Sequence, residues 1–439
     1  MEYRKEVVDS LYRVTEKKKY SNIEIKESIV RFDSKQEKDL YVYNFYGVVE
    51  NIIFVDWVIA AYSSIKISKI NDKVLNILRL AVFQLFFNDH LSESKIVFES
   101  VELTKKYLFK SHKFVNGILR SIIRNKDNIV MEVNNLEKTK YLSVKYSYPI
   151  ELITKLISEF GYEMAEQFCI ASNTKPDMIV RVNQTKISRD LFYDTYNGLE
   201  FQIDKTTLSH TGIIIRNPHN IEKTDMYIKG LITPQDESSM LVGQILNPQK
   251  NSHIIDMCCA PGGKCLHAAE ICDNTSFVVG CDIFEHKLRL VDNNVKRLEL
   301  SNISLKIQDA TVLNEDFIGK FDYCIVDVPC SNSGIIRRKP EIKYRMDLPR
   351  FDELLNLQKN ILENASKYLK KDGKLIYSTC SVFDEENIDL VKYFLDRHKD
   401  FKFDDFVIND KNHVGYIKLL PHIDNTDGFF IACLKRTHL

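Results

Sequence analysis

The sequence has no excess of either charge. Lysine and arginine together number 61, and aspartate and glutamate together also number 61. Since net charge gives no sign of a polyanion partner, any nucleic-acid-binding surface must be a local patch. By itself, a basic cluster is typical of the solvated face of a helix. The richest such cluster comprises Lys105, Lys106, Lys110, Lys113, Arg120, Arg124 and Lys126.

Long apolar runs are also missing. The N-terminus, Met1 to Asp9, has no apolar core of signal-peptide length, and the most apolar segment, residues 51–62, is short and interrupted by Asp56. We therefore expect a cytoplasmic protein with no membrane partner.

Cysteine pairs with the spacing C-x-x-C are absent from the ten cysteines, so the sequence offers no zinc motif and no metal is expected. Eight of the ten lie between Cys258 and Cys380. Most fall on predicted strands and helices, where cysteine behaves as a small buried apolar residue. Cys330 and Cys380 differ, because each follows the end of a predicted strand.

The chain of 439 residues is too long for one compact core, so several domains are expected. Apolar residues recur with helical spacing up to about residue 130, which predicts an all-helical bundle. Residues 134–145 are polar and predict a linker, and residues 149–172 predict one helix opened by Pro149.

A small α+β segment follows. We predict strands over residues 178–183, 199–203 and 212–215 and a helix over residues 188–196. This order is similar to an RNA-recognition module, with Arg181 and Asn183 as candidate RNA contacts.

Helices and strands alternate from residue 230 to the end, which predicts an α/β doubly wound sheet. The fold class is therefore multidomain. The predicted domains are residues 1–133, 145–229 and 230–439.

The most informative stretch is Asp-Met-Cys-Cys-Ala-Pro-Gly-Gly-Lys at residues 256–264. It lies between a predicted strand and a predicted helix. Two adjacent glycines let the backbone approach a ligand, and the helix N-terminus offers free N–H groups. The stretch lacks the spaced glycines of a dinucleotide site and the Lys-Ser/Thr ending of a phosphate loop. A different nucleoside ligand is therefore predicted.

Acidic residues follow four successive predicted strands, namely Asp256, Asp282, Asp309 and Asp327. A single aspartate in such a position is as readily explained by helix capping or a turn. Four at one edge of a parallel sheet indicate a ligand crevice, because ligands bind outside the carboxyl ends of the strands.

Cys330 follows the fourth strand of this domain and Cys380 follows the fifth, so both should open on the same crevice. A partly exposed thiol near a helix N-terminus can reach the reactive thiolate form. Two such cysteines beside a nucleoside loop favour nucleophilic chemistry over two inert residues.

Two motifs in the helical region resemble the NusB-type RNA-binding domain: Leu-Arg-Leu-Ala-Val-Phe-Gln-Leu at residues 78–85 and Lys-Phe-Val-Asn-Gly-Ile-Leu-Arg at residues 113–120. The resemblance covers residues 1 to about 130 and implies an all-α bundle.

Three motifs in the α/β region resemble the S-adenosylmethionine-dependent RNA cytosine-5 methyltransferases: residues 256–264, residues 327–331 with 334–338, and residues 377–381 with 385–387. Together with the NusB-like region, the whole chain is similar to the RsmB (Sun/Fmu) family, which modifies bacterial 16S ribosomal RNA. This implies a Rossmann-like methyltransferase domain, the cofactor S-adenosylmethionine, a 16S ribosomal RNA partner, no DNA partner and a monomer.

Carried over by position, the resemblance assigns roles to individual residues. Cys380 becomes the nucleophile and Cys330 assists product release. Independently of the family, the chemistry needs an acid beside the ring nitrogen, and Asp327 is well placed to contact N3 of the base. Val328, Asn332 and Ser333 depart from the family pattern, which bears on rate or substrate detail. The implied cofactor contacts are Cys258, Cys259, Ala260, Pro261, Gly262, Gly263, Lys264, Asp282, Asp309 and Asp327.

Alternatives remain open on two points. DNA cytosine-5 enzymes use a Pro-Cys cysteine after the fourth strand, so Cys330 competes with Cys380 as the nucleophile. For function, the alternatives to a 16S rRNA methyltransferase are a transfer RNA cytosine-5 methyltransferase and a non-catalytic RNA-binding factor in ribosome assembly or antitermination.

Overall fold

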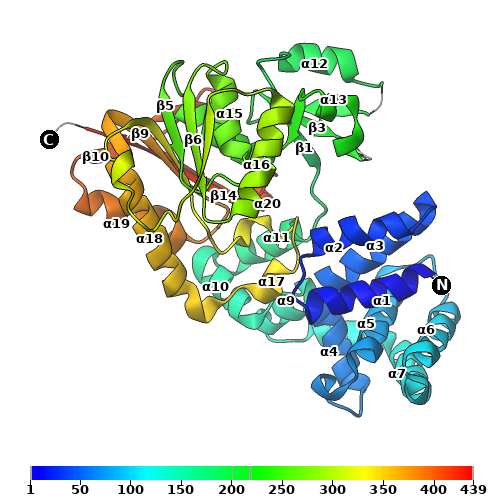
Figure 1. Cartoon of the computed structure of the whole chain (residues 1–439). Coiled ribbons are helices and arrows are strands. Elements are labelled where there is room, and N and C mark those ends of the chain that lie inside the picture. Colours follow the sequence, from blue (N-terminus) through cyan, green and yellow to red (C-terminus); the bar gives the residue numbers. More distant parts are fainter. Residues whose placement is uncertain (1, 200, 217, 219, 438–439) are drawn as a thin grey trace. The chain divides into compact units, whose positions relative to one another are not determined.

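The N-terminal part of the chain is helical throughout (Figure 1), as predicted. The structure is a computed structural model that describes residues 2–199, 201–216, 218 and 220–437. Helix α5 is the centre of the bundle, because every residue from Val74 to Leu85 is buried. The helices are α1 Glu2–Thr15, α2 Ser21–Ser28, α3 Lys35–Glu50, α4 Ile52–Tyr62, α5 Asp72–Phe87, α6 Glu93–Leu108, α7 His112–Arg124, α8 Lys126–Asn134, α9 Lys138–Tyr146, α10 Ile150–Phe160 and α11 Tyr162–Ser172.

Two predictions for this region are wrong. The expected linker at residues 134–145 contains most of α9, whose first amides are capped by the carboxylate of Glu137 and whose Leu142 and Val144 are buried. Burial of these apolar residues outweighs the polar composition. The single helix expected over residues 149–172 is broken into α10 and α11 at Gly161, whose φ of 78° is incompatible with a continuous helix.

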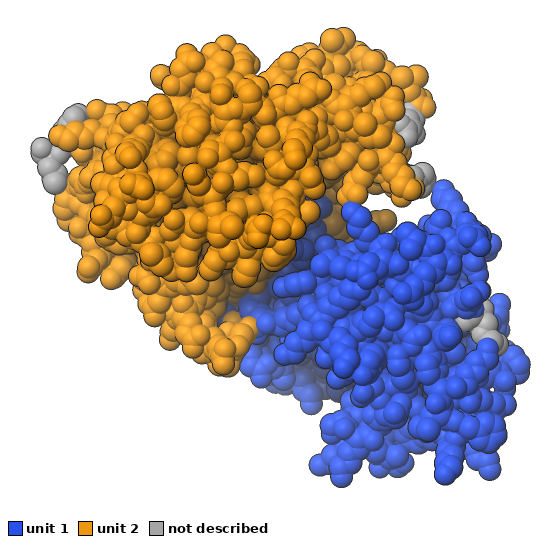
Figure 2. All heavy atoms as spheres, in the orientation of Figure 1, with its two compact units in different colours: residues 1–174, 336–346 blue, residues 175–335, 347–439 orange. Residues whose placement is uncertain are grey.

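The chain divides into two compact units (Figure 2): residues 1–174 with 336–346, and residues 175–335 with 347–439. Residues 336–346 thus belong with the helices, although they directly follow the loop that carries Cys330. Their anchor is Lys343, whose ammonium donates to the carbonyl oxygen of Glu50 at 2.8 Å. Burial lowers the pKa of Lys343 to about 7 and raises that of Glu50 to about 7.

Among the described residues, no single helix is long and apolar enough to cross a membrane. Helices α3 and α4 taken together are long and apolar enough, but the chain bends between them. In α4, Phe54, Val55, Val58 and Ile59 are packed into the core of the helical unit.

The second unit begins with a four-stranded antiparallel sheet in the order β2-β3-β1-β4. Its core contains Val180, Val182, Ile213 and Ile215. The strand expected over residues 199–203 is largely misplaced, because β2 begins only at Ile203; Glu200 lies outside the described residues. The elements are β1 Met178–Val182, α12 Arg189–Tyr196, β2 Ile203–Lys205, β3 Gly212–Ile215, α13 Asp225–Ile228 and β4 Ile232–Pro234.

The larger sheet has the order β10-β14-β9-β8-β5-β6-β7, with β13 paired to β14. Strands β5 to β9 run parallel, and β14 is antiparallel to β9. This confirms the predicted Rossmann-like α/β domain. Its strands are β5 His253–Asp256, β6 Phe277–Asp282, β7 Ile303–Ile307, β8 Phe321–Asp327, β9 Leu369–Thr379, β10 Phe401–Phe403, β13 Tyr416–Leu419 and β14 Phe429–Arg436.

Helices connect these strands and bury apolar residues against both faces of the sheet. A separate hairpin joins β11 Phe406–Ile408 to β12 Lys411–His413. The helices are α14 Glu237–Leu246, α15 Gly263–Ile271, α16 Glu285–Leu298, α17 Ile342–Arg345 in the first unit, α18 Phe351–Tyr368, α19 Ile388–Arg397 and α20 Pro421–Asp424.

Candidate active site

Carboxylates lie at the carboxyl ends of adjacent parallel strands. Asp327 ends β8, Asp256 ends β5 and Asp282 ends β6, and these strands are neighbours in the sheet. Asp309 follows β7 and uses one carboxylate oxygen to accept from the amide and hydroxyl of Thr311, which closes its own turn. The shared strand direction therefore brings the predicted acidic residues to one edge of the sheet.

The glycine-rich loop turns sharply into α15. Gly262 has a φ of 105°, and a Cβ built on it would lie 3.1 Å from Cγ1 of Val291. The position therefore requires glycine for both its conformation and its space. Gly263 then begins α15, whose first turn has no side-chain cap from Gly262.

Asp256 is buried, and within the described part of the chain its Oδ2 has no hydrogen-bond partner. Its Oδ1 accepts from the amide of Cys258 at 3.2 Å. Burial, with a further contribution from the charge of Asp327, raises the pKa of Asp256 to about 7. An unpaired buried oxygen is costly unless a ligand satisfies it, so Asp256 is suited to a cationic group.

Asp327 is held from two sides. Lys264 Nζ contacts Oδ2 at 2.7 Å, and the hydroxyl of Ser378 donates to Oδ1 at 2.8 Å. Burial works against the charged form of Lys264, but Asp327 and Asp256 raise its pKa. The helix that follows the glycine-rich loop and the fourth strand of the domain are thus joined by a charged pair at the carboxyl edge of the sheet.

The two predicted cysteines are in contact. The Sγ atoms of Cys330 and Cys380 lie 2.9 Å apart, and both thiols are free. Cys330 is buried, whereas Cys380 is partly exposed. The contact with Cys380 and burial together raise the pKa of Cys330, which therefore stays protonated at neutral pH.

Glu386 joins the loop that carries Cys330 to the loop that carries Cys380. This fully buried carboxylate accepts from the amide of Ser331 at 2.8 Å, from its hydroxyl at 2.6 Å and from the hydroxyl of Ser381. Gln358 of α18 adds a donor at 2.8 Å. Sequence reasoning missed Glu386 and Gln358 as site residues; the only signal for Glu386 was its place in the Glu-Glu-Asn motif.

Gly334 and Gly428 allow the backbones of neighbouring loops to lie close together. The amide of Gly334 donates to the carbonyl oxygen of Cys380 at 2.9 Å, and the amide of Gly428 donates to that of Gly334 at 2.9 Å. A Cβ on Gly334 would lie 1.9 Å from the carbonyl oxygen of Gly428. No side chain fits at residue 334 without moving backbone.

Gly334→Ala should therefore destabilise the second unit by about 3 kcal/mol, the upper end of the usual cost of overpacking, and reduce any activity that uses Cys380. Thermal unfolding of the full chain measures the change. Gly117→Ala is the matched control, because its Cβ in α7 meets no atom within 4 Å. Equal melting temperatures for Gly334→Ala and the unaltered protein would contradict the crowded geometry.

Arg181 and Asn183 are not exposed RNA contacts, and that prediction is wrong. Arg181 is 1% exposed and pairs with the carboxylate of Glu270 through two hydrogen bonds of 2.9 Å; it also donates to the carbonyl oxygen of Gly263. Asn183 is buried and donates to the carbonyl oxygen of Gly230. Arg181 instead links β1 to α15, a role that strand periodicity alone does not reveal.

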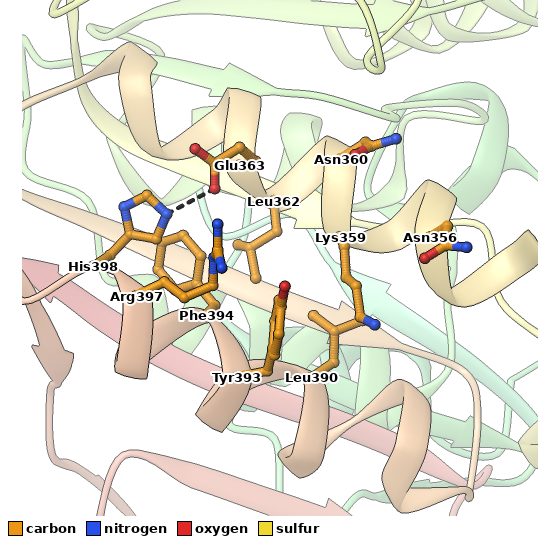
Figure 3. Close-up of a pocket in the computed structure, with 10 residues that line it drawn as sticks. All are labelled: Asn356, Lys359, Asn360, Leu362, Glu363, Leu390, Tyr393, Phe394, Arg397 and His398. Carbon is orange, nitrogen blue, oxygen red and sulfur yellow. Dashed lines mark hydrogen bonds and ion pairs between the residues drawn. The ribbon is translucent and has the colours of Figure 1, made fainter. Parts of the chain in front are cut away.

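A hollow between α18 and α19 contains none of the predicted site residues (Figure 3). Tyr393 and Phe394 are aromatic residues of its lining, and Lys359 Nζ and Arg397 Cζ lie 4.8 Å and 5.5 Å from the ring centroid of Tyr393. His398 pairs with Glu363 at 2.7 Å. The cysteines and strand-end carboxylates therefore form the candidate site by themselves.

The fold and the site define a Rossmann-like methyltransferase joined to an N-terminal helical domain. Three family models match: "NusB family" over residues 1–124, "Methyltr_RsmF/B-like, ferredoxin-like domain" over residues 148–222, and "16S rRNA methyltransferase RsmB/F" over residues 243–435. The chain belongs to the RsmB/F family of 16S rRNA methyltransferases.

Curated relatives match along almost the whole chain. "Probable ribosomal RNA small subunit methyltransferase B" of Bacillus subtilis (strain 168) is 31% identical, covering 98% of this chain and 97% of its own. "Ribosomal RNA small subunit methyltransferase B" of Shewanella oneidensis is 30% identical and covers 98% of each chain. The crystal structure of PH0851 has a TM-score of 0.81 at 23% identity over 99% of this chain and 98% of its own, which shows the same fold.

Proposed function

We propose that this protein transfers a methyl group from S-adenosylmethionine to carbon 5 of a cytosine in 16S ribosomal RNA through a covalent bond between Cys380 and carbon 6. The observation that carries the proposal is the pair of thiols 2.9 Å apart beside the strand-end carboxylates. The substrate class comes from the family and from the relatives, which are named as small-subunit methyltransferases.

A thiolate is required because carbon 5 of cytosine is too electron-poor to attack a methyl donor. Addition of sulfur at carbon 6 makes carbon 5 carbanion-like and divides one difficult step into easier ones. Cys380 is the more accessible thiol, and Cys330 keeps its proton because its pKa is raised. This difference favours Cys380 as the nucleophile and Cys330 as its hydrogen-bond donor.

Asp327 is the proposed contact to N3 of the base. As sulfur adds to carbon 6, negative charge develops on the ring nitrogen, so the Asp327 carboxyl must act there in its protonated form, as a hydrogen-bond or proton donor to that nitrogen. The contacts from Lys264 and Ser378 fix the Asp327 carboxyl before substrate arrives. Fixed geometry matters, because dipoles that need not reorganise stabilise a transition state best.

The residues at the sheet edge fit S-adenosylmethionine. The buried, unpaired oxygen of Asp256 suits a cationic amino group, and Asp282 ends the second strand of the domain, where carboxylates hold ribose hydroxyls. The cofactor supplies an electrophilic methyl group. We propose that it contacts Asp256 together with the residues implied by the sequence: Cys258, Cys259, Ala260, Pro261, Gly262, Gly263, Lys264, Asp282, Asp309 and Asp327.

Product release needs loss of the carbon 5 proton to a base and cleavage of the carbon 6–sulfur bond, with the electron pair returning to Cys380. The S–H group of Cys330 can hydrogen-bond the departing sulfur at the observed separation. Cys330 would thus lower the energy of the leaving thiolate.

Binding of S-adenosylmethionine should tighten as pH rises through about 7, because Asp256 loses its proton there and gains a charge that attracts a cationic group. We expect an affinity change of roughly tenfold between pH 6 and pH 8, measured by titration calorimetry. Asp256→Asn should bind more weakly and without this pH dependence. An unchanged pH dependence in Asp256→Asn would remove Asp256 from the cofactor site.

Methyl transfer from radiolabelled S-adenosylmethionine to small-subunit ribosomal RNA tests the reaction, and bisulfite mapping of ribosomal RNA from cells with and without the gene identifies the nucleotide. The proposal is supported if one cytosine of 16S ribosomal RNA resists bisulfite conversion only in cells that carry the gene. Labelling of transfer RNA alone would indicate a transfer RNA methyltransferase instead, and labelling of no RNA would favour a non-catalytic assembly factor. The target base must be single-stranded or leave its stack to reach the thiols.

We propose a monomer, as the family resemblance implies. A ribosomal RNA substrate places the activity in the cytoplasm.

A further inference from the structure

Asn332 lies between the two cysteines and contacts both. Its Nδ2 donates to the carbonyl oxygen of Cys330 at 2.9 Å, and its Oδ1 accepts from the thiol of Cys380 at 3.1 Å. Its backbone has a φ of 59°, a left-handed conformation that asparagine tolerates better than most residues. The side chain is therefore placed by its own backbone and by the loop that carries Cys330.

The orientation of this amide is not interchangeable. Turning the amide over would place Oδ1 against the carbonyl oxygen of Cys330, two acceptors with no proton between them. The Cys330 carbonyl thus obliges Asn332 to present an acceptor, not a donor, to Cys380.

This acceptor determines where the two thiol protons lie. Cys380 has one S–H, and it is used in the hydrogen bond to Asn332. The contact between the two Sγ atoms must then use the proton of Cys330. Cys330 therefore donates to Cys380, and the reverse arrangement would leave Oδ1 of Asn332 without a donor.

We propose that Asn332 is a positioning residue that assigns the protons of the cysteine pair, holding the Cys380 thiol protonated at rest and directing the Cys330 proton onto the Cys380 sulfur. The use of this arrangement in methyl transfer rests on the function proposed above. The positions of the two thiol protons do not depend on that function, and they can be tested without RNA or cofactor.

The charged and titratable groups around the pair belong to several elements. Lys264 on α15 interacts electrostatically with Cys380, and Asp327 at the end of β8 pairs with Lys264. Glu386, before α19, lies near enough to Cys330 to disfavour its charged form. None of these contacts depends on the side chain of Asn332, so a variant at residue 332 changes the proton arrangement while they remain.

Iodoacetamide alkylation of the full chain, followed by mass spectrometry of the peptide that contains Cys380, reports its thiolate fraction against pH. Asn332→Gly keeps the left-handed backbone and removes the acceptor. The midpoint of its pH profile should fall by roughly half to one pH unit, which is about a threefold to tenfold faster reaction below the midpoint.

Asn332→Asp is the second variant: it keeps an acceptor oxygen toward Cys380 and adds a negative charge, while its other oxygen loses the hydrogen bond to the carbonyl oxygen of Cys330. Its midpoint should rise, since a nearby anion disfavours the thiolate. A loop that was merely loosened would raise the alkylation rate at every pH without moving the midpoint. Identical midpoints for Asn332→Gly and the unaltered protein, or shifts of both variants in one direction, would overturn the proposal.

These outcomes are independent of the reaction. If no RNA is methylated by the unaltered protein but the two midpoints move in opposite directions, the proposed function fails and the role of Asn332 stands. If RNA is methylated but the midpoints coincide, only the role of Asn332 fails.

Discussion

Cys380→Ala should lower methyl transfer to ribosomal RNA by about 1,000-fold or more. Without a sulfur at residue 380, carbon 6 has no nucleophile and carbon 5 never becomes reactive. The proposed cofactor contacts come from the loop that leads into α15 and from the ends of β5, β6, β7 and β8, and none of them involves Cys380, so binding of S-adenosylmethionine should persist. The readout is label transfer to RNA with cofactor affinity measured in parallel.

Cys272→Ala is the control for that loss. Cys272 follows α15 and its thiol donates to the carbonyl oxygens of Pro248 and Gln249, away from the crevice. Its replacement should leave turnover within about twofold, as expected for a site outside the reacting groups. Full turnover by Cys380→Ala would end the proposal that this thiol attacks the base.

Cys330→Ala should have the opposite effect on the covalent species. Addition and methylation remain possible, but the hydrogen bond from the Cys330 thiol to the departing sulfur is lost, so release should slow by about 100-fold or more. The enzyme should accumulate as an adduct with RNA, seen as a slower band on a denaturing gel that resists boiling in detergent.

The double variant, Cys330→Ala with Cys380→Ala, is the control and should form no adduct. The two single variants also decide between the cysteines. An adduct formed by Cys380→Ala and none by Cys330→Ala would exchange their roles and make the Pro-Cys thiol the nucleophile. The difference in exposure and protonation of the two thiols predicts the contrary.

Much of the α/β domain was predictable because its elements have strong periodicity and clear ends. The apolar spacing predicts helices over residues 237–246, 263–271 and 285–298, and α14, α15 and α16 have these bounds. Apolar runs followed by aspartate also located β5, β6 and β8. Local pattern is informative here because each strand is buried on both faces and must be continuously apolar.

Predictions failed where a contact distant in sequence outweighed local composition. Polar residues 134–145 predicted a linker, yet Leu142 and Val144 are buried and the segment is mostly helical. Arg181 looked like a surface strand residue, yet it is buried because Glu270, 89 residues away, neutralises it. A buried charge is tolerated only when such a partner is present. Arg181 and Glu270 are too far apart in the sequence for any local pattern to reveal that they pair.

The sequence by itself determined which residues could do chemistry: two cysteines after neighbouring strands, a glycine-rich turn and a series of strand-end carboxylates. Only the tertiary structure decided how they are used. Contact between thiols 50 residues apart, the clamp by Glu386 and the amide of Asn332 all depend on where loops from different strands meet. Hydrogen bonds act only over about 3 Å, so proton positions follow from the folded arrangement and not from the order of residues.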